Sequence, residues 1–247
     1  MKKALIAAGI AALMSGAAQA DAIGLYIGGQ YWANQADGKF GEPGNLQDFD
    51  FKKQNQGSYY IAVEHPLPII PNVKLAYTKL DTTGSTTLSS DFKFGDVTIP
   101  AGSTAATTFD LNYVDYTFYY EVFSNDLLAF DFGLTGRDFN ADILVSSGDQ
   151  NGQLKGSQIV PLFYASTVIG LPFTGFKVFA DGNFLTFDDH TVYDYQVGVG
   201  YSLLDNIAID LDLQAGYRAA SFKLEDVSDL STDVKFDGFF LGAQMHF

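Results

Sequence analysis

The final residues of the chain alternate between apolar side chains and small or polar ones. One side of this run carries Phe239, Leu241, Ala243, Met245 and Phe247. Because successive side chains of a strand point to opposite faces, the run predicts a β-strand with one apolar face.

Similar runs recur along the chain and predict ten strands. In the clearest of them, such as Asp194–Leu203, the charged residue falls on the face opposite the apolar one. The predicted strands are residues 22–33, 57–65, 73–80, a run that ends with 116–122, and residues 128–137, 159–171, 176–186, 194–203, 207–218 and 239–247. The segment Phe109–Val114 is out of phase with the end of the fourth run, which indicates a bulge or a section above a membrane.

The expected connections alternate in length. Short turns are predicted near Pro66, Ser124, Pro172 and Asp205, and long loops from about Asn34, Asp81 and Asn140. This alternation is typical of transmembrane barrels, with both termini on the periplasmic side and an even number of strands. Eight strands would turn two runs into loop hairpins, and twelve would need strands within residues 82–107. We therefore expect an all-β, transmembrane, antiparallel up-and-down β-barrel of about ten strands.

The composition agrees with strands in lipid. Charged residues make up 17% of the chain and aromatic residues 15%, whereas soluble domains carry about 25% charged residues. Hydrocarbon offers no water to an unpaired backbone group, so a sheet in lipid must close on itself. We therefore expect the strand at 22–33 to pair with the strand at 239–247.

The amino end has the pattern of a secretory signal peptide. Lys2 and Lys3 precede an apolar stretch, and Ala18-Gln19-Ala20 forms a small-x-small cleavage site. This predicts a signal peptide at residues 1–20, an outer-membrane β-barrel domain at 21–247 and export through the periplasm of a Gram-negative bacterium. No cysteine is present, so neither a disulfide nor a thiolate metal site can form.

Two resemblances support this location. The spacing Phe240-x-Gly242-x-x-Met245-x-Phe247 resembles the C-terminal signal that the barrel-assembly machinery reads in outer-membrane proteins, which implies that machinery as a partner. The chain also resembles an uncharacterised family of small outer-membrane β-barrels from gammaproteobacteria. That resemblance is carried by the segments 24–28 with Tyr31-Trp32, 119–121, 171–175 and 199–201. It implies a location and a fold but no substrate.

The charge balance limits the partners. The formal net charge is -15, and without Lys2 and Lys3 the chain would carry 12 basic against 29 acidic residues, a net charge of -17. A polyanion would be repelled, so nucleic acid is not expected as a partner. Outer-membrane lipid and lipopolysaccharide are the expected surroundings, and the oligomeric state stays open.

The inward face of the predicted strands carries the charges, which form a candidate lumen charge network. Its members are Glu64, Lys74, Asp115, Glu121, Asp131, Arg137, Lys177, Asp181, Asp194, Asp210, Asp212 and Arg218. Buried charges must be paired or reached by water. Two hypotheses follow: a plug of salt bridges that holds the barrel together, or a narrow wet path that favours cations.

Catalysis is not predicted, and neither a cofactor nor a metal site is expected. The one suggestive cluster is Asp188-Asp189-His190, because a carboxylate beside a histidine can orient a general base. The ten-stranded omptin proteases resemble this chain in strand count and in their use of Asp with His. They also need a second acidic pair at a separate position on the rim, and no residues of this chain match it. We expect a non-enzymatic barrel, either structural or a narrow solute or ion conduit. The alternatives are a surface hydrolase and a loop that binds a partner or divalent cations through Asp48 and Asp50.

Overall fold

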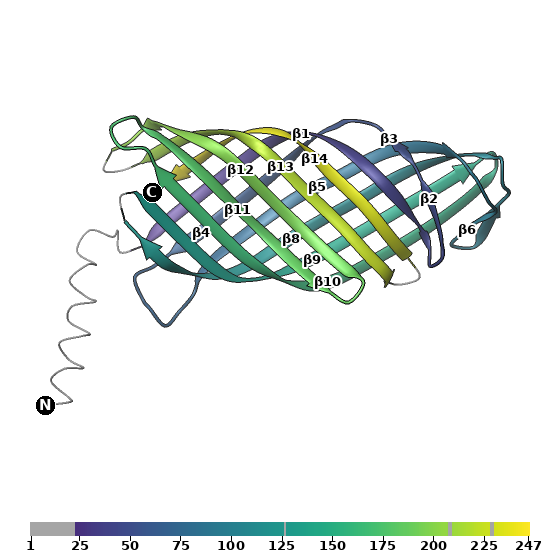
Figure 1. Cartoon of the computed structure of the whole chain (residues 1–247), viewed down its shortest axis with the longest axis horizontal. Coiled ribbons are helices and arrows are strands. Elements are labelled where there is room, and N and C mark those ends of the chain that lie inside the picture. Colours follow the sequence, from purple (N-terminus) through teal and green to yellow (C-terminus); the bar gives the residue numbers. More distant parts are fainter. Residues whose placement is uncertain (1–22, 126, 207–208, 228–229) are drawn as a thin grey trace, which may run out of the picture.

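A computed structural model describes residues 23–125, 127–206, 209–227 and 230–247 (Figure 1). Ten long antiparallel strands form a closed barrel within this part of the chain, so the expected strand number is confirmed and the alternatives of eight and twelve are wrong. The barrel strands are β1 (Gly24–Glu42), β4 (Gln54–Glu64), β5 (Asn72–Thr87), β8 (Thr104–Ser124), β9 (Leu128–Ser147), β10 (Gln150–Gly170), β11 (Phe176–Phe187), β12 (His190–Leu204), β13 (Asp210–Val227) and β14 (Leu230–His246).

The first and last strands join as expected. β1 pairs with β14 from Tyr26 opposite His246 to Gly41 opposite Ser231. Just past the end of β14, Phe247 continues this pairing: the amides of Leu25 and Phe247 each donate to the other's carbonyl, at 3.2 and 3.0 Å. Both ends of the barrel domain therefore lie at one end of the barrel, which we call the terminal end, and the opposite end is called the far end (Figure 1).

The connections at the terminal end are short, but the long loops expected at the far end are largely strand. β9 runs to Ser147 and β10 begins at Gln150, so no loop starts at Asn140. The region from Asn34 to Gln56 continues β1 and then adds β2 (Asn45–Asp48) and β3 (Asp50–Phe51). The region after Asp81 continues β5, and β6 (Phe92–Phe94) and β7 (Val97–Ile99) then form a hairpin.

The terminal half of the barrel has an apolar outer surface. Outward side chains such as Phe118, Phe132 and Val199 are exposed, while inward side chains such as Asp115 and Gln196 face the lumen. This is the arrangement of a strand that meets lipid outside and polar groups inside. No helix of the described residues is long and apolar enough to cross a membrane.

The polarity of the two faces inverts along the strands. On the far part of β8 the inward Phe109, Leu111 and Tyr113 are buried, whereas the outward Asp110 and Asn112 are partly exposed. The pairing of this part with β5 and β9 runs without a register shift. The out-of-phase segment is therefore not a bulge: its apolar side chains change face because they line a packed interior.

That interior forms a second, apolar core at the far end, which we call the far core. Its members are Phe40, Phe49, Phe51, Leu80, Phe92, Phe94, Ile99, Phe109, Val145 and Phe236. Phe40 stacks on Phe49 at 4.5 Å between ring centroids and meets Phe94 edge-on at 5.7 Å. The β6–β7 hairpin lies against β1, β2 and β10; it buries Phe92, Phe94 and Ile99 completely and Val97 in part. The far end is thus filled with apolar side chains.

The predicted signal peptide, residues 1–20, lies outside the described residues.

Candidate functional site

Two arginines stand just below the far core and are held by two aspartates; we call these four residues the arginine layer. Arg137 of β9 donates to both oxygens of Asp115, Nε to Oδ1 at 2.7 Å and Nη2 to Oδ2 at 2.6 Å. Its Nη2 also reaches Asp194 Oδ2 at 3.0 Å. Arg218 of β13 binds Asp194 with the same bidentate geometry: Nε donates to Oδ1 at 2.9 Å and Nη2 to Oδ2 at 2.8 Å. Such charge-assisted, bidentate hydrogen bonds are about twice as strong as hydrogen bonds between neutral groups.

Neighbouring side chains complete this layer. The Tyr113 hydroxyl donates to Asp194 Oδ2 at 2.6 Å, and the guanidinium of Arg137 lies 3.9 Å from the centre of the Tyr113 ring. Arg218 lies 4.8 Å from the Trp32 ring and donates to Thr78 Oγ1 at 3.1 Å. Since the four ionic side chains are at most 8% exposed, water is almost excluded from the layer.

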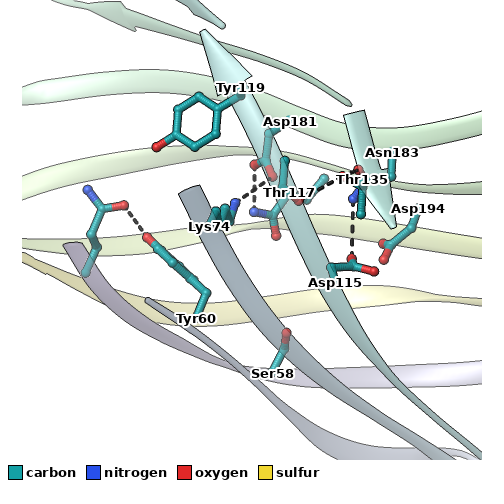
Figure 2. Close-up of polar contacts among 12 residues, drawn as sticks. Ser58, Tyr60, Lys74, Asp115, Thr117, Tyr119, Thr135, Asp181, Asn183 and Asp194 are labelled. Carbon is teal, nitrogen blue, oxygen red and sulfur yellow. Dashed lines mark hydrogen bonds and ion pairs between the residues drawn. The ribbon is translucent and has the colours of Figure 1, made fainter. Parts of the chain in front are cut away.

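A chain of hydroxyl and amide groups leads away from the layer (Figure 2). The hydroxyls of Thr117 and Thr135 are 2.8 Å apart, and Thr135 donates to Asn183 Oδ1 at 2.6 Å. Asn183 in turn reaches Asp115 Oδ2 at 3.4 Å. These hydrogen bonds connect the arginine layer to β11 and add to the ion pairs that already join β8, β9, β12 and β13.

Between the arginine layer and the terminal end lies a polar cavity of about 370 Å³, the lumen cavity. Lys74 and Asp181 face each other across it at 3.7 Å, as Figure 2 shows. The Lys74 ammonium also lies 4.8 Å from the centre of the Tyr60 ring and 5.5 Å from that of Tyr164. Gln196 donates to Asp181 Oδ2 at 2.7 Å, so this carboxylate has one hydrogen-bond donor besides its ion pair with Lys74.

The terminal end of the lumen is acidic. Glu64 accepts a hydrogen bond from the Tyr119 hydroxyl at 2.8 Å. Glu121 and Asp131 lie directly opposite each other on β8 and β9. Among the described residues, no lysine or arginine forms an ion pair with these three acids.

All twelve members of the predicted charge network occupy inward positions, in three groups. Arg137 and Arg218 hold Asp115 and Asp194, and the two lysines bind one aspartate each, Lys74 with Asp181 and Lys177 with Asp212. The other four are Glu64, Glu121, Asp131 and Asp210, of which Asp210 meets His246 Nδ1 at 3.3 Å.

Sequence analysis did not identify the uncharged side chains that contact the lumen charge network. Tyr113 and Tyr164 both turn their rings toward cations of the lumen, Tyr113 also donates its hydroxyl to Asp194, and Asn183 bridges to the arginine layer. Tyr113 shares its face with Asp115, so the alternation of β8 held a signal for it. Nothing in the sequence marks the pairing of Arg137 with an aspartate on β12, because these strands are not neighbours.

The other predicted sites have simple surroundings. His190 begins β12 and its Nδ1 accepts the Glu225 amide at 3.3 Å; among the described residues, no hydrogen bond or ion pair joins its ring to the Asp188 or Asp189 carboxylate. Asp48 and Asp50 are exposed. Within the described ranges, no group of three or more His, Cys, Asp or Glu side chains is arranged to hold a metal ion.

The predicted assembly signal is divided between the two faces of β14. Phe240 points inward and is buried, and Gly242 lies on the same face. Met245 points outward and is exposed, as is Phe247 just beyond the strand.

Comparisons with known proteins show the class of fold. No protein-family model and no curated protein matches the chain. The solved structure of the outer membrane protease OmpT from Escherichia coli is similar with a TM-score of 0.55 and 10% identity, covering 93% of this chain and 99% of that one. The translocator domain of the autotransporter NalP from Neisseria meningitidis gives a TM-score of 0.46 and 13% identity, over 98% and 95% of the two chains. The toluene transporter TodX from Pseudomonas putida gives 0.34 and 9%, over 96% and 93%. The chain thus has the fold of outer-membrane β-barrels of Gram-negative bacteria.

Proposed function

We propose that this protein is a non-enzymatic outer-membrane β-barrel whose lumen is closed, so that its role is structural rather than that of an open conduit. The terminal end faces the periplasm and the far end stands outside the cell. Short turns at one end and longer structure at the other support this orientation. The membership in a gammaproteobacterial family of small barrels belongs to the same proposal.

The observation that carries the proposal is the double closure of the lumen. The lumen cavity reaches the arginine layer, whose ionic side chains are almost fully buried. Beyond that layer the far core fills the barrel with aromatic rings. An ion on a through path would have to break buried ion pairs and then cross an apolar interior, and both steps are costly.

The surroundings of the barrel follow from its outer surface. The exposed apolar side chains of the terminal half are suited to lipid, and the polar outer face of the far half is suited to water and to lipopolysaccharide headgroups. Met245 and Phe247 remain on the outside of β14, where the barrel-assembly machinery would meet them during folding.

A narrow conduit remains the second candidate, and one observation favours it. The lumen cavity already extends from the terminal end to the middle of the barrel, and its lining carries more acids than bases. A path for cations would therefore need only the layer and the far core to open.

Planar-bilayer recording separates these candidates. We expect the folded full-length barrel to give no single-channel steps in concentrated potassium chloride. The barrel is delivered to the bilayer from lipid vesicles, and protease protection of these vesicles verifies that it is inserted. Stepwise currents that scale with the amount of inserted protein would contradict a closed lumen and support the conduit.

The non-enzymatic part has its own test. Peptide and lipid hydrolysis by the folded protein is expected to be no faster than by the His190→Ala variant. Hydrolysis that is lost in the variant would support the surface hydrolase instead.

A further inference from the structure

We propose that the lumen cavity binds a small organic cation, such as a primary amine, that enters from the terminal end. The proposal rests on the proposed function in one respect: a closed lumen leaves this cavity open only toward the terminal end. Its carrying observations are the excess of acids in the cavity, a second pairing of aromatic rings with a carboxylate, and a buried acceptor without a donor.

The first observation is the charge balance of the lining. Among the described residues the cavity is lined by six acids and three bases. The acids nearest the arginine layer are neutralised: Asp181 by Lys74, Asp194 by Arg218, and Asp115 by an arginine behind it. The acids in excess are therefore those at the terminal end.

These excess acids are close enough to repel one another. Glu121 and Asp131 are directly opposite in the pairing of β8 with β9, and their side chains share the lumen face. Like charges in opposite positions destabilise a sheet. A bound cation between these carboxylates would turn that repulsion into attraction.

The second observation is that the barrel already uses the proposed chemistry once. The Lys74 ammonium lies between the rings of Tyr60 and Tyr164 and faces the Asp181 carboxylate. Attraction of a cation to ring faces, combined with one carboxylate, is how proteins recognise organic ammonium groups.

The same elements recur one step closer to the terminal end. Tyr119, Glu64 and Tyr26 all line the cavity, and the Tyr119 hydroxyl donates to Glu64. The Tyr119 ring lies 5.6 Å from the Tyr164 ring, so the two arrangements are adjacent. An ammonium group of a ligand would meet here the partners that Lys74 meets deeper inside.

The third observation is a buried acceptor in the cavity wall. Gln196 uses its amide nitrogen to bind Asp181, whereas its Oε1 is buried and has no donor among the described residues. Buried polar atoms are nearly always hydrogen-bonded. Because this oxygen has almost no surface open to the cavity, a rotation of the Gln196 amide would bring it within reach of a ligand N–H group.

The size of the site and its ligand atoms select the class of ligand. A volume of about 370 Å³ is at the small end of the range for ligand sites, which is about 300–1,000 Å³. The described residues offer no cluster suited to a metal ion. An organic cation with a short aliphatic chain uses the rings as well as the carboxylates.

The experiment is isothermal titration calorimetry of the full-length barrel, folded in a zwitterionic detergent, with 1,4-diaminobutane as the probe. We expect a saturable heat that 1,4-butanediol, which has the same length and no charge, does not give. Asp131→Asn is expected to weaken binding about tenfold, the effect of one lost charge-assisted hydrogen bond.

A matched control lies on the same strand. Asp138→Asn makes the same chemical change on β9, but at an outward position seven residues away, and is expected to leave the affinity within about twofold. Tyr119→Leu, which removes a ring and keeps every carboxylate, is expected to weaken binding and thereby to separate a built site from plain charge attraction.

The proposal would be overturned by the absence of a saturable heat, by equal effects of Asp131→Asn and Asp138→Asn, or by equal heats with magnesium chloride. If Asp131→Asn does not fold, Glu64→Gln is the replacement and the same outcomes apply. Failure of the closed lumen would instead appear as bilayer current, which this titration does not measure.

Discussion

Replacing Arg137 by methionine tests whether the arginine layer holds the barrel together. The substitution keeps most of the side-chain volume and removes the charge. It removes three hydrogen bonds to carboxylates and leaves Asp115, which is 5% exposed, with Asn183 at 3.4 Å as its remaining donor. Asp194 still keeps Arg218 and Tyr113.

The magnitude follows from these contacts. Removing one partner of a buried ion pair costs about 3–5 kcal/mol. The lost attraction between Arg137 and the Tyr113 ring adds about 2 kcal/mol. The change also removes a buried guanidinium nitrogen, Nη1, that has no partner among the described residues, which returns about 1–3 kcal/mol. We therefore expect Arg137→Met to lower the free energy of unfolding by about 4 kcal/mol.

The assay is urea unfolding in lipid vesicles, followed by fluorescence. Trp32 is the one tryptophan of the chain, is 1% exposed, and lies beside Arg218 in the arginine layer. With a slope of about 2 kcal/mol per molar urea, the midpoint should fall by about 2 M. The exposed pair of Lys155 with Asp142 is the control, and Lys155→Met should cost less than about 1 kcal/mol.

A double-mutant cycle decides whether the loss comes from the ion pair. Arg137→Met combined with Asp115→Asn leaves no uncompensated charge at Asp115, so the double variant should be more stable than the sum of the single losses predicts, by at least about 1.5 kcal/mol. A single loss below about 1 kcal/mol, or strict additivity, would refute the view that this pair stabilises the barrel.

Three further predictions concern stability and titration. Gly28→Ala would place a methyl group 2.3 Å from an aromatic ring on β4 and should cost about 1–3 kcal/mol, whereas Gly156→Ala, which meets nothing within 4 Å, should cost no stability in the same urea assay; equal losses would contradict the steric argument. Phe40→Ala removes a ring from the centre of the far core and should cost about 3–5 kcal/mol, and a loss below 1 kcal/mol would show that the far core is loosely packed. Hydrogen bonds from Lys155 and a neighbouring glutamine lower the pKa of Asp142, so its stabilising contribution is present at neutral pH and is lost as the pH falls through that lowered pKa; carboxyl NMR should show the pKa rising in Lys155→Met, and an unchanged pKa would contradict this cause.

Much of the barrel could be predicted because lipid imposes a simple pattern. Along β12 every second residue from Tyr195 to Leu203 meets apolar surroundings, and every other one meets the lumen. Two different surroundings on the two faces of a strand produce strict alternation, which is readable from one sequence. The pairing of β1 with β14 followed from the same requirement.

That rule fails for the far half of the barrel, because there the apolar side chains point inward and the polar side chains point outward. Phe109 and Leu111 point inward there, whereas Tyr116 and Phe118 of the same strand point outward. The resulting change of phase resembles a bulge in the sequence. A phase change without an insertion is instead the mark of a strand that leaves lipid while its interior becomes apolar.

The arginine layer was foreseeable only in part. Alternation places Arg137 and Asp194 on lumen faces, but the strands that carry them are separated by β10 and β11. Which charges meet across the lumen depends on the tilt and stagger of the whole barrel. Tilt and stagger are set by the register of all the strand pairs together, so no single sequence segment reveals them.

The proposed closure of the lumen has a consequence for a cell that makes this protein. Every open pore in an envelope admits nutrients together with detergents and antibiotics, and so sets a ceiling on how many copies are tolerable. With the lumen closed at Arg137 and Arg218 as proposed, the barrel would add no leak of its own. Its copy number would then not be limited by the permeability of the envelope.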